Sequence, residues 1–115
     1  MVNVPSFDIT GEVVLVTGAS SGNGRHFAEV LAAAGAKVAA AARRAERLAE
    51  LARDIESRGG TCVPLACDVT KQDSIREAVA NAEDRLGPLS VLVNNAGVVV
   101  SKPLFEHSEA DWDYV

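Results

Sequence analysis

Four short runs of apolar residues alternate with three segments of helical pattern, and this alternation restricts the fold more than any other feature. The runs cover Val13–Val16, Lys37–Ala42, Thr61–Ala66 and Ser90–Asn94. Because they are apolar at consecutive positions, they indicate strands buried on both faces of a parallel sheet. The alanine-rich second run has the weakest strand propensity. Strands that alternate with helices predict an α/β fold with a doubly wound sheet and right-handed crossovers.

Each segment between the runs carries one apolar stripe on an otherwise polar helix. Gly35, Gly59 and Gly87 follow the three segments and mark their C-terminal ends. The apolar residues of each stripe recur at spacings of three and four. They are Phe27, Val30, Leu31 and Ala34 in the first segment, Leu48, Leu51, Ala52 and Ile55 in the second, and Ile75, Val79, Ala82 and Leu86 in the third.

Two polar residues mark helix starts. Thr70 and Ser108 are expected N-caps, and each has an aspartate three residues later, Asp73 and Asp111, in a weak capping-box pattern. The second of them opens a fourth helical segment. The predicted order is therefore βαβαβαβ followed by the start of a fourth helix, with no separate second domain.

Length and charge exclude several classes of protein. The 115 residues suffice for one domain or part of one, and a hydrophobic content of 48% predicts a packed core. A net charge of −5 disfavours binding to nucleic-acid phosphates. No apolar run approaches the roughly 20 residues of a membrane span, and no signal-peptide pattern is present. We expect no nucleic-acid or membrane partner and a cytoplasmic location, where Cys62 and Cys67 stay reduced.

A glycine-rich turn, TGASSGNG, follows the first run and opens the first helical segment at residues 17–24. A phosphate binds well at a helix N-terminus, because free N–H groups and the helix dipole both face it. Gly18 allows the tight turn, whereas Gly22 and Gly24 let the backbone approach a pyrophosphate and the helix pack on the strand. The turn predicts a nucleotide site, with a plain βα turn as the alternative. Its hydroxyl donors are Ser20 and Ser21.

The second strand ends without an acidic residue. Dinucleotide-binding folds place Asp or Glu here to bind the ribose 2′-hydroxyl, but this chain has Ala42 followed by Arg43 and Arg44. Without the acid nothing repels a 2′-phosphate, and a guanidinium can pair with it through two hydrogen bonds. We therefore expect NADP to be preferred over NAD. The alternative is that the two arginines simply begin a solvated helix.

Two further polar motifs follow the third and fourth strands. Asp68 can accept a hydrogen bond from an adenine amino group, and the Val69 N–H can donate to the ring; an ordinary polar strand end is the alternative. In Asn94–Gly97, asparagine tolerates unusual backbone angles, and the small residues after it leave room for a ligand. Taken alone, this second motif is better interpreted as a turn.

The order and spacing of these motifs resemble the classical short-chain dehydrogenase/reductase family, from about Asp8 to Val115. The motifs that carry the resemblance are Thr17-Gly18-x-x-x-Gly22-x-Gly24, Asp68-Val69 and Asn94-Asn95-Ala96-Gly97. The family implies a Rossmann fold, a nicotinamide dinucleotide, and hydride transfer to or from a carbonyl or alcohol carbon of a small-molecule substrate. It also implies dimers or tetramers in most members.

The resemblance implies roles for single residues. The stretch from Gly18 to Gly24 would line the pyrophosphate, and Asn23, where the family commonly has Ile, can still serve through its backbone N–H. Arg43, with Arg44 beside it, would bind the 2′-phosphate. The adenine would be held by Asp68 and Val69. The residues that would pack against the adenosine ribose and brace the sheet are Asn95, Ala96 and Gly97.

The resemblance covers only the cofactor-binding part of the family. The family's catalytic Asn comes a few residues past Val115, and its Ser and Tyr-x-x-x-Lys come much later. Tyr114 is the only tyrosine and Lys102 precedes it, so no catalytic residue is assigned. Residues 1–115 are interpreted as a partial dinucleotide-binding domain, with a non-catalytic nucleotide-binding module or an inactive truncated product as alternatives. The histidines and cysteines lack the spacing of metal ligands, so no metal site is expected.

The family's strand order, 3-2-1-4, would place the fourth strand at an edge of the sheet. Its backbone N–H and C=O groups would be unpaired there, beside apolar side chains such as Leu92. Exposed apolar edges seek partners. We therefore expect the chain to form a homo-oligomer, to aggregate, or to pair with a complementary chain.

Overall fold

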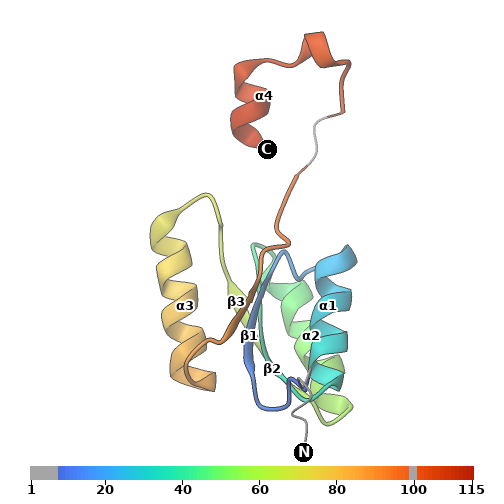
Figure 1. The fold of residues 1–115 in the computed structure, drawn as a ribbon, viewed down its shortest axis with the longest axis vertical. Helices are drawn as coiled ribbons and strands as arrows, with labels where there is room; N and C mark the ends of the chain where they lie inside the picture. Colours follow the sequence, from blue (N-terminus) through green and yellow to red (C-terminus); the bar gives the residue numbers. More distant parts are fainter. Residues whose placement is uncertain (1–7, 99–100) are drawn as a thin grey trace, which may run out of the picture.

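The computed structural model describes residues 8–98 and 101–115 and contains one parallel sheet with helices on both faces (Figure 1). The strand order is β3-β2-β1-β4, and every neighbouring pair is parallel. The predicted doubly wound α/β fold is confirmed. The elements are β1 (Val13–Thr17), α1 (Gly22–Ala33), β2 (Lys37–Ala42), α2 (Ala45–Ser57), β3 (Thr61–Ala66), α3 (Gln72–Leu86), β4 (Val91–Val93), the 3-10 helix η1 (Leu104–Glu106) and α4 (Glu109–Tyr114).

The strands lie where the apolar runs predict them, with small differences at their ends. β2 and β3 occupy the predicted residues, β1 extends to Thr17, and β4 is shorter than predicted at both ends. The alanine-rich β2 is a strand despite its weak propensity because it lies between β1 and β3 and is covered on both faces. Its Ala39 and Ala40 are fully buried. Their small side chains let both helical layers approach the sheet closely.

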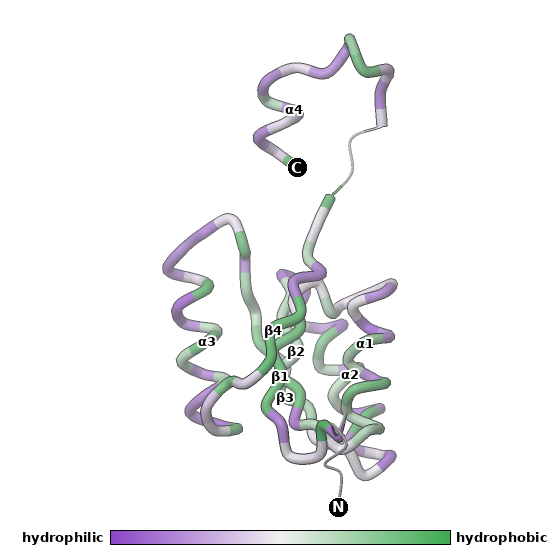
Figure 2. Tube along the Cα trace, viewed as in Figure 1, coloured by the Kyte–Doolittle hydropathy of each residue, from purple (hydrophilic) through white to green (hydrophobic). Residues whose placement is uncertain are grey.

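Two apolar cores lie on opposite faces of the sheet, one under α1 and α2 and the other under α3 (Figures 1 and 2). Val14 and Val16 of β1 belong to the first core and Leu15 to the second, as alternation along a strand requires. The two free thiols are divided in the same way, Cys62 in the first core and Cys67 in the second. Burial raises the pKa of Cys62 to about 12, so this thiol stays protonated.

The predicted packing face of α1 is wrong for three of its four residues, and only Leu31 among the four packs against the first core. The buried residues are Gly24, Ala28 and Ala32, whereas Phe27 is 40% and Val30 51% exposed. The buried residues recur every four positions, so they form one ridge of very small side chains. A helix with such a ridge lies closer to the sheet than one that packs on Phe or Val. Close approach to the sheet therefore decided which face packs, and Phe27 and Val30 lie on the exposed side.

The other two helices follow the predicted stripes more closely. All four predicted residues of α2 are buried. In α3, Ala82 is buried and Val79 and Leu86 pack against the second core, but Ile75 is 39% exposed and Ala78 is buried instead. Three of the four predicted residues of α3 thus face the second core, and Ala78 takes the place of Ile75.

The helix ends are partly as predicted. Ser108 caps α4: its hydroxyl accepts from the Asp111 N–H at 3.1 Å, while the Asp111 carboxylate accepts from the Ser108 N–H at 3.0 Å. This confirms the second capping box. The first is wrong, because Lys71 is the N-cap of α3, and the Thr70 hydroxyl donates to Asp68. The three helix-ending glycines all have positive φ, as C-terminal stops require.

An apolar surface lies open beside β4, which within residues 8–98 and 101–115 pairs with β1 alone. Phe27, Val30 and Leu31 of α1 line a cavity of about 430 Å³ together with Val93 of β4; we call these four residues the α1–β4 surface. The opposite edge strand, β3, contains Pro64, which cannot donate to a further strand. Among the described residues, no helix is long and apolar enough to cross a membrane.

We expect the chain in isolation to associate through the α1–β4 surface, because exposed apolar area next to an unpaired strand edge favours contact with a partner. Light scattering after size-exclusion chromatography at micromolar concentration should give a mass above the 12.0 kDa of one chain. Val30→Lys, which places a charge on the surface, should lower that mass. Glu50→Lys, an exposed change on α2, should leave it unchanged. A monomeric wild type would contradict the prediction.

Candidate functional site

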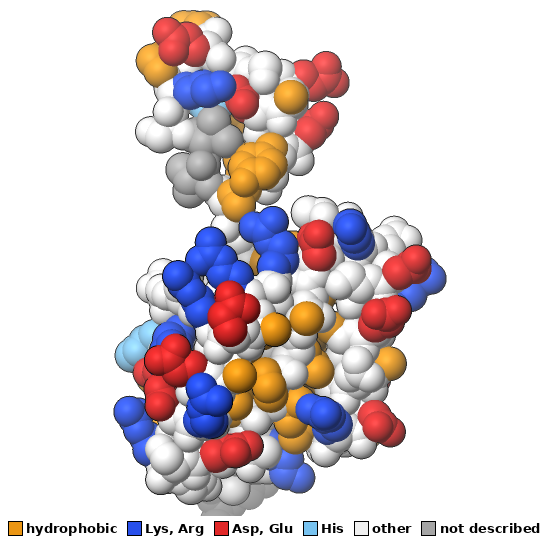
Figure 3. Space-filling model, turned by 180° about the vertical axis from the view of Figure 1, so that it is seen from behind, with side chains coloured by type: hydrophobic (Ala, Val, Ile, Leu, Met, Phe, Trp, Pro, Cys, Tyr) orange, Lys and Arg blue, Asp and Glu red, His pale blue; other side chains and the backbone are white. Residues whose placement is uncertain are grey.

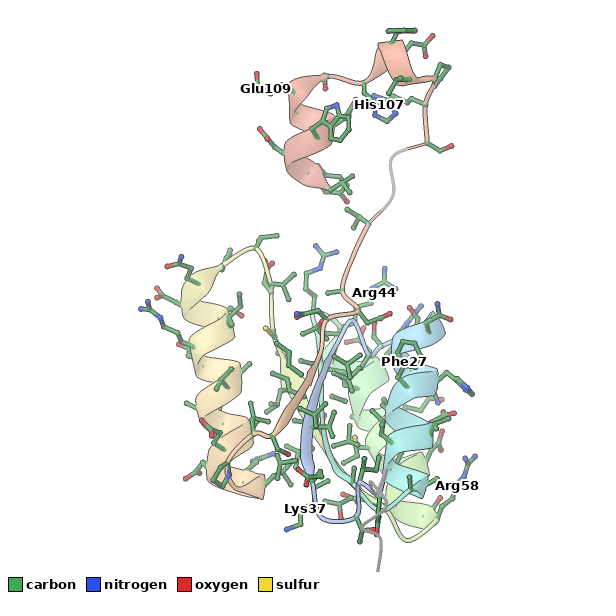
Figure 4. All side chains as sticks on the ribbon, in the orientation of Figure 1. Phe27, Lys37, Arg44, Arg58, His107 and Glu109 are labelled. Atoms are coloured by element: carbon green, nitrogen blue, oxygen red, sulfur yellow. The ribbon has the colours of Figure 1, made fainter. Side chains whose placement is uncertain are left out.

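The carboxyl ends of the four strands meet at one edge of the sheet, and the segments that follow them surround a cavity of about 760 Å³. Open α/β sheets bind ligands at this edge, where the strand order reverses, here between β1 and β4. Figure 4 shows Arg44 at this end of the sheet and Lys37 and Arg58 at the other. The cavity is lined by Gly18, Ser20, Ser21, Ala41, Ala42, Arg43, Arg44, Cys67, Asp68, Val69, Thr70, Asn95, Ala96, Gly97 and Val98, with Asp113, Tyr114 and Val115 at the C-terminus.

The cavity therefore brings together ten of the predicted site residues, from all four strand ends. Three predicted residues do not line it: Gly22, Asn23 and Gly24 belong to the first turn of α1. A part for their backbone N–H groups in binding a pyrophosphate stays a prediction. The role of each predicted residue toward a ligand stays a prediction.

The turn after β1 is built around close backbone contacts. Gly18 has φ +64°, and a Cβ there would lie 2.9 Å from the Ala96 Cα atom. A Cβ on Gly24 would overlap the Gly18 carbonyl oxygen and the Asn95 side-chain amide. Larger residues at either position would push the β1 and β4 ends apart. Gly24 thus acts by letting α1 pack against the turn, one of the two functions expected of it.

The two residues that precede α1, Ser20 and Ser21, line the cavity. Ser21 is the N-cap, and its side chain makes no capping hydrogen bond. Helix N-termini carry free N–H groups and a partial positive charge, so they attract anions. Ser20 and Ser21 line the cavity next to this terminus. The arrangement can hold a phosphate through backbone N–H groups and hydroxyls.

A buried threonine joins the ends of β1 and β4. The Thr17 hydroxyl accepts from the backbone N–H groups of Asn95 and Ala96, both at 3.0 Å, and donates to the Val93 carbonyl at 3.4 Å. The Asn95 side-chain amide also donates to the Gly18 carbonyl, at 3.3 Å. Thr17 is only 8% exposed, and all its hydrogen-bonding capacity is used.

Thr17 was part of the sequence motif but was not predicted as a site residue. Its partners are almost 80 positions away in the chain, so its role depends on β4 lying next to β1. A threonine that ends an otherwise apolar strand was the one available signal.

The end of β2 supplies positive charge to the cavity. Ala42 is buried, and Arg43 and Arg44 after it are exposed and line the cavity. Within residues 8–98 and 101–115, neither guanidinium forms an ion pair. Figure 3 shows basic side chains gathered at this end of the sheet. The two arginines are therefore available to an anion.

Asp68, at the end of β3, is held by its neighbours. Its Oδ1 atom accepts from the Thr70 hydroxyl at 2.6 Å and from the Thr70 N–H at 3.0 Å. Its own N–H donates to the Ser74 hydroxyl at 2.8 Å. The hydrogen bonds from Thr70, and then the charges of Lys71 and Arg43, lower the pKa of the Asp68 carboxyl below its ordinary value. The group is an anion and an acceptor at neutral pH.

Comparison with known proteins identifies the family. A profile described as short chain dehydrogenase matches residues 12–115. The chain belongs to the short-chain dehydrogenase family. Among its relatives, gluconate 5-dehydrogenase from Gluconobacter oxydans is 41% identical over 107 residues, which are 93% of this chain and 42% of that protein. A 3beta-hydroxysteroid dehydrogenase from Mediterraneibacter gnavus is 40% identical over 102 residues, 88% of this chain and 37% of that protein.

The fold agrees with solved short-chain dehydrogenases. The crystal structure of a short-chain type dehydrogenase/reductase from Mycobacterium marinum matches with a TM-score of 0.86 and 36% identity, over 93% of this chain and 42% of that one. The chain thus spans about two fifths of the length of the relatives it matches. The family consists of oxidoreductases. In the described part of the chain, no group of three or more His, Cys, Asp or Glu residues could hold a metal ion.

We expect Thr17→Val to destabilise the fold by about 1–3 kcal/mol, because it leaves the Asn95 and Ala96 N–H groups without their acceptor. Urea denaturation followed by circular dichroism measures the change. Thr61→Val, at the exposed start of β3, is the matched control and should change the free energy of unfolding by less than about 0.5 kcal/mol. Equal effects of the two variants would refute the role of Thr17 as the link between β1 and β4.

Proposed function

We propose that this chain binds the adenosine and pyrophosphate of NADP and forms the cofactor-binding part of an oxidoreductase. The observation that carries the proposal is the convergence of four predicted motifs on one cavity of about 760 Å³ at the carboxyl edge of the sheet. When bound, the nicotinamide would accept or supply a hydride at a carbonyl or alcohol carbon of a small-molecule substrate. The residues of this chain bind and orient the other end of the dinucleotide.

The donors and acceptors around the cavity complement three parts of a dinucleotide: the pyrophosphate, the adenine and the ribose between them. The N-terminus of α1, with Ser20 and Ser21, suits the pyrophosphate. Asp68 and Val69 suit the adenine, because they offer an acceptor next to a donor. The small residues Ala96 and Gly97 leave room for the ribose between the ends of β1 and β4.

The preference for NADP rests on charge. Ala42 provides no carboxylate to accept from a ribose 2′-hydroxyl or to repel a 2′-phosphate. Arg43 and Arg44 line the cavity and form no ion pair within the described residues. A guanidinium binds a phosphate through two parallel charged hydrogen bonds. A 2′-phosphate therefore gains partners that a 2′-hydroxyl cannot use.

We predict that NADP binds more tightly than NAD and that Arg43→Ala weakens NADP binding roughly ten- to a hundredfold, since a hydrogen bond to a charged group contributes about 1.5–3 kcal/mol. NAD binding should not change. Isothermal titration calorimetry with both dinucleotides measures this. Arg47→Ala removes an exposed arginine of α2 that does not line the cavity, and it should affect neither dinucleotide. Tighter binding of NAD than of NADP by the wild type would overturn the assignment.

A non-catalytic nucleotide-binding module is the second candidate. It is favoured by one observation: these 115 residues contain a single tyrosine, Tyr114, and no lysine after it, so Tyr-x-x-x-Lys has no match. These residues therefore supply no tyrosine–lysine pair for proton transfer at a substrate oxygen. Either candidate requires the dinucleotide to bind here.

The two candidates differ in turnover. We predict that the chain alone, at a concentration where NADP binding is measurable, oxidises or reduces no member of a panel of alcohols, aldehydes, ketones and sugar acids. Absorbance of the reduced nicotinamide measures turnover, and titration of NADP in the same sample is the control for a folded site. Turnover above the buffer rate, carried through purification to one species, would show that the chain holds catalytic groups of its own.

A further inference from the structure

Three hydrogen bonds hold Asp68 in place without any ligand. Two go from Thr70 to one carboxylate oxygen, Oδ1, at 2.6 Å from the hydroxyl and 3.0 Å from the N–H. The third goes from the Asp68 N–H to the Ser74 hydroxyl, at 2.8 Å. Ser74 lies in the first turn of α3, so it ties the residue to a helix that packs on the second core. The side chain and the backbone of Asp68 are therefore fixed separately.

One acceptor and one donor are left over at this point of the cavity. In the part of the chain that the structure describes, the Asp68 Oδ2 atom accepts no hydrogen bond and the Val69 N–H donates none. Asp68, Val69 and Thr70 all line the cavity. Because both hydrogen bonds from Thr70 go to Oδ1, the groups that Asp68 and Val69 offer a ligand are the Oδ2 atom as an acceptor and the Val69 N–H as a donor.

This pair matches one kind of purine. Adenine carries an amino donor at C6 beside the acceptor N1, so it complements a carboxylate oxygen beside an N–H. A 6-oxopurine such as hypoxanthine carries an acceptor at C6 beside an N1–H donor, which reverses both partners. Such a base would set its oxygen against the anionic Asp68 carboxylate and its N–H against the Val69 N–H. Sites built around specific hydrogen bonds reject ligands that cannot form them.

We infer that Thr70 and Ser74 are positioning residues that select the base: by fixing Asp68 they leave Oδ2 as the acceptor for a 6-amino group, so the cavity takes a 6-aminopurine dinucleotide and rejects the 6-oxo analogue. The inference rests on the proposed function, since it concerns the same cavity. Without the Thr70 hydroxyl, only the Thr70 N–H still donates to Oδ1, so the carboxylate is held less firmly and its two oxygens exchange more easily. Ordering it again on binding would then cost conformational entropy.

Calorimetric titration of NADP and of nicotinamide hypoxanthine dinucleotide phosphate tests the inference. The wild type should prefer NADP roughly ten- to a hundredfold, the value of two net hydrogen bonds. Thr70→Val should lower this selectivity roughly three- to tenfold through weaker NADP binding, with the analogue unchanged. Ser74→Ala should act in the same direction. Thr70→Ser keeps both hydrogen bonds to Asp68 and should keep the selectivity.

The chain offers a matched control at the other end of the sheet. The Asp8 Oδ1 atom accepts from the Thr10 N–H at 2.9 Å and from the Thr10 hydroxyl at 2.6 Å, the same pattern as at Asp68. Thr10→Val removes the equivalent hydroxyl away from the cavity and should leave base selectivity unchanged. A second readout needs no ligand: the pKa of the Asp68 carboxyl, which Thr70 lowers, should rise toward its ordinary value in Thr70→Val and is measurable by NMR titration.

The outcomes separate the inference from the proposed function. A wild type that binds neither dinucleotide refutes both. A wild type that binds both equally, or a Thr70→Val variant and a Ser74→Ala variant that keep full selectivity, leaves the cofactor assignment standing and overturns the role of Thr70 and Ser74. A loss of selectivity in Thr70→Val that Thr10→Val does not share supports the inference.

Discussion

β1 is buried along its whole length, and the other elements take their places from it. It pairs with β2 on one edge and β4 on the other, and its side chains enter both apolar cores. A parallel sheet is stable only when both of its faces are covered. The crossover helices that supply this cover also return the chain to the same end for each new strand. All four strands therefore point their carboxyl ends at one edge, where the polar turns collect.

Many polar groups at that edge form hydrogen bonds with one another. Thr17 uses its whole hydrogen-bonding capacity on Val93, Asn95 and Ala96, and Asp68 uses one oxygen on Thr70. The chain's side of the cavity is thus fixed by internal hydrogen bonds. Among the described residues, the groups that make no hydrogen bond or ion pair there include the guanidiniums of Arg43 and Arg44, the Asp68 Oδ2 atom and the Val69 N–H. The chemistry of a ligand is therefore better inferred from the donors and acceptors that have no partner within the chain than from those that already form hydrogen bonds.

The chain is acidic overall, but the cavity is lined by two arginines. The chain carries a net charge of −5, yet Arg43 and Arg44 line the cavity. The hydrogen bonds from Thr70, and then the charges of Lys71 and Arg43, lower the pKa of the Asp68 carboxyl. The cavity accordingly combines positive charge for phosphates with one anionic acceptor for an amino group. An acidic surface elsewhere discourages unspecific contact with polyanions, so the local positive charge acts on ligands small enough to enter.

The sequence by itself determined the fold class, the four strands and the order of the polar motifs. Consecutive apolar residues, glycine stops and a glycine turn are local signals, and the stripe of α2 is wide and apolar enough to leave one choice of face. Only the tertiary structure decided which face of α1 packs, because the ridge of Gly24, Ala28 and Ala32 is favoured by close approach to the sheet rather than by hydrophobicity. It also decided the link from Thr17 to Asn95, which exists because β4 lies beside β1, and the hold of Thr70 and Ser74 on Asp68, which required α3 to begin at Gln72. Hydrophobic periodicity reports what one element can bury, whereas hydrogen bonds between strand ends depend on which elements become neighbours.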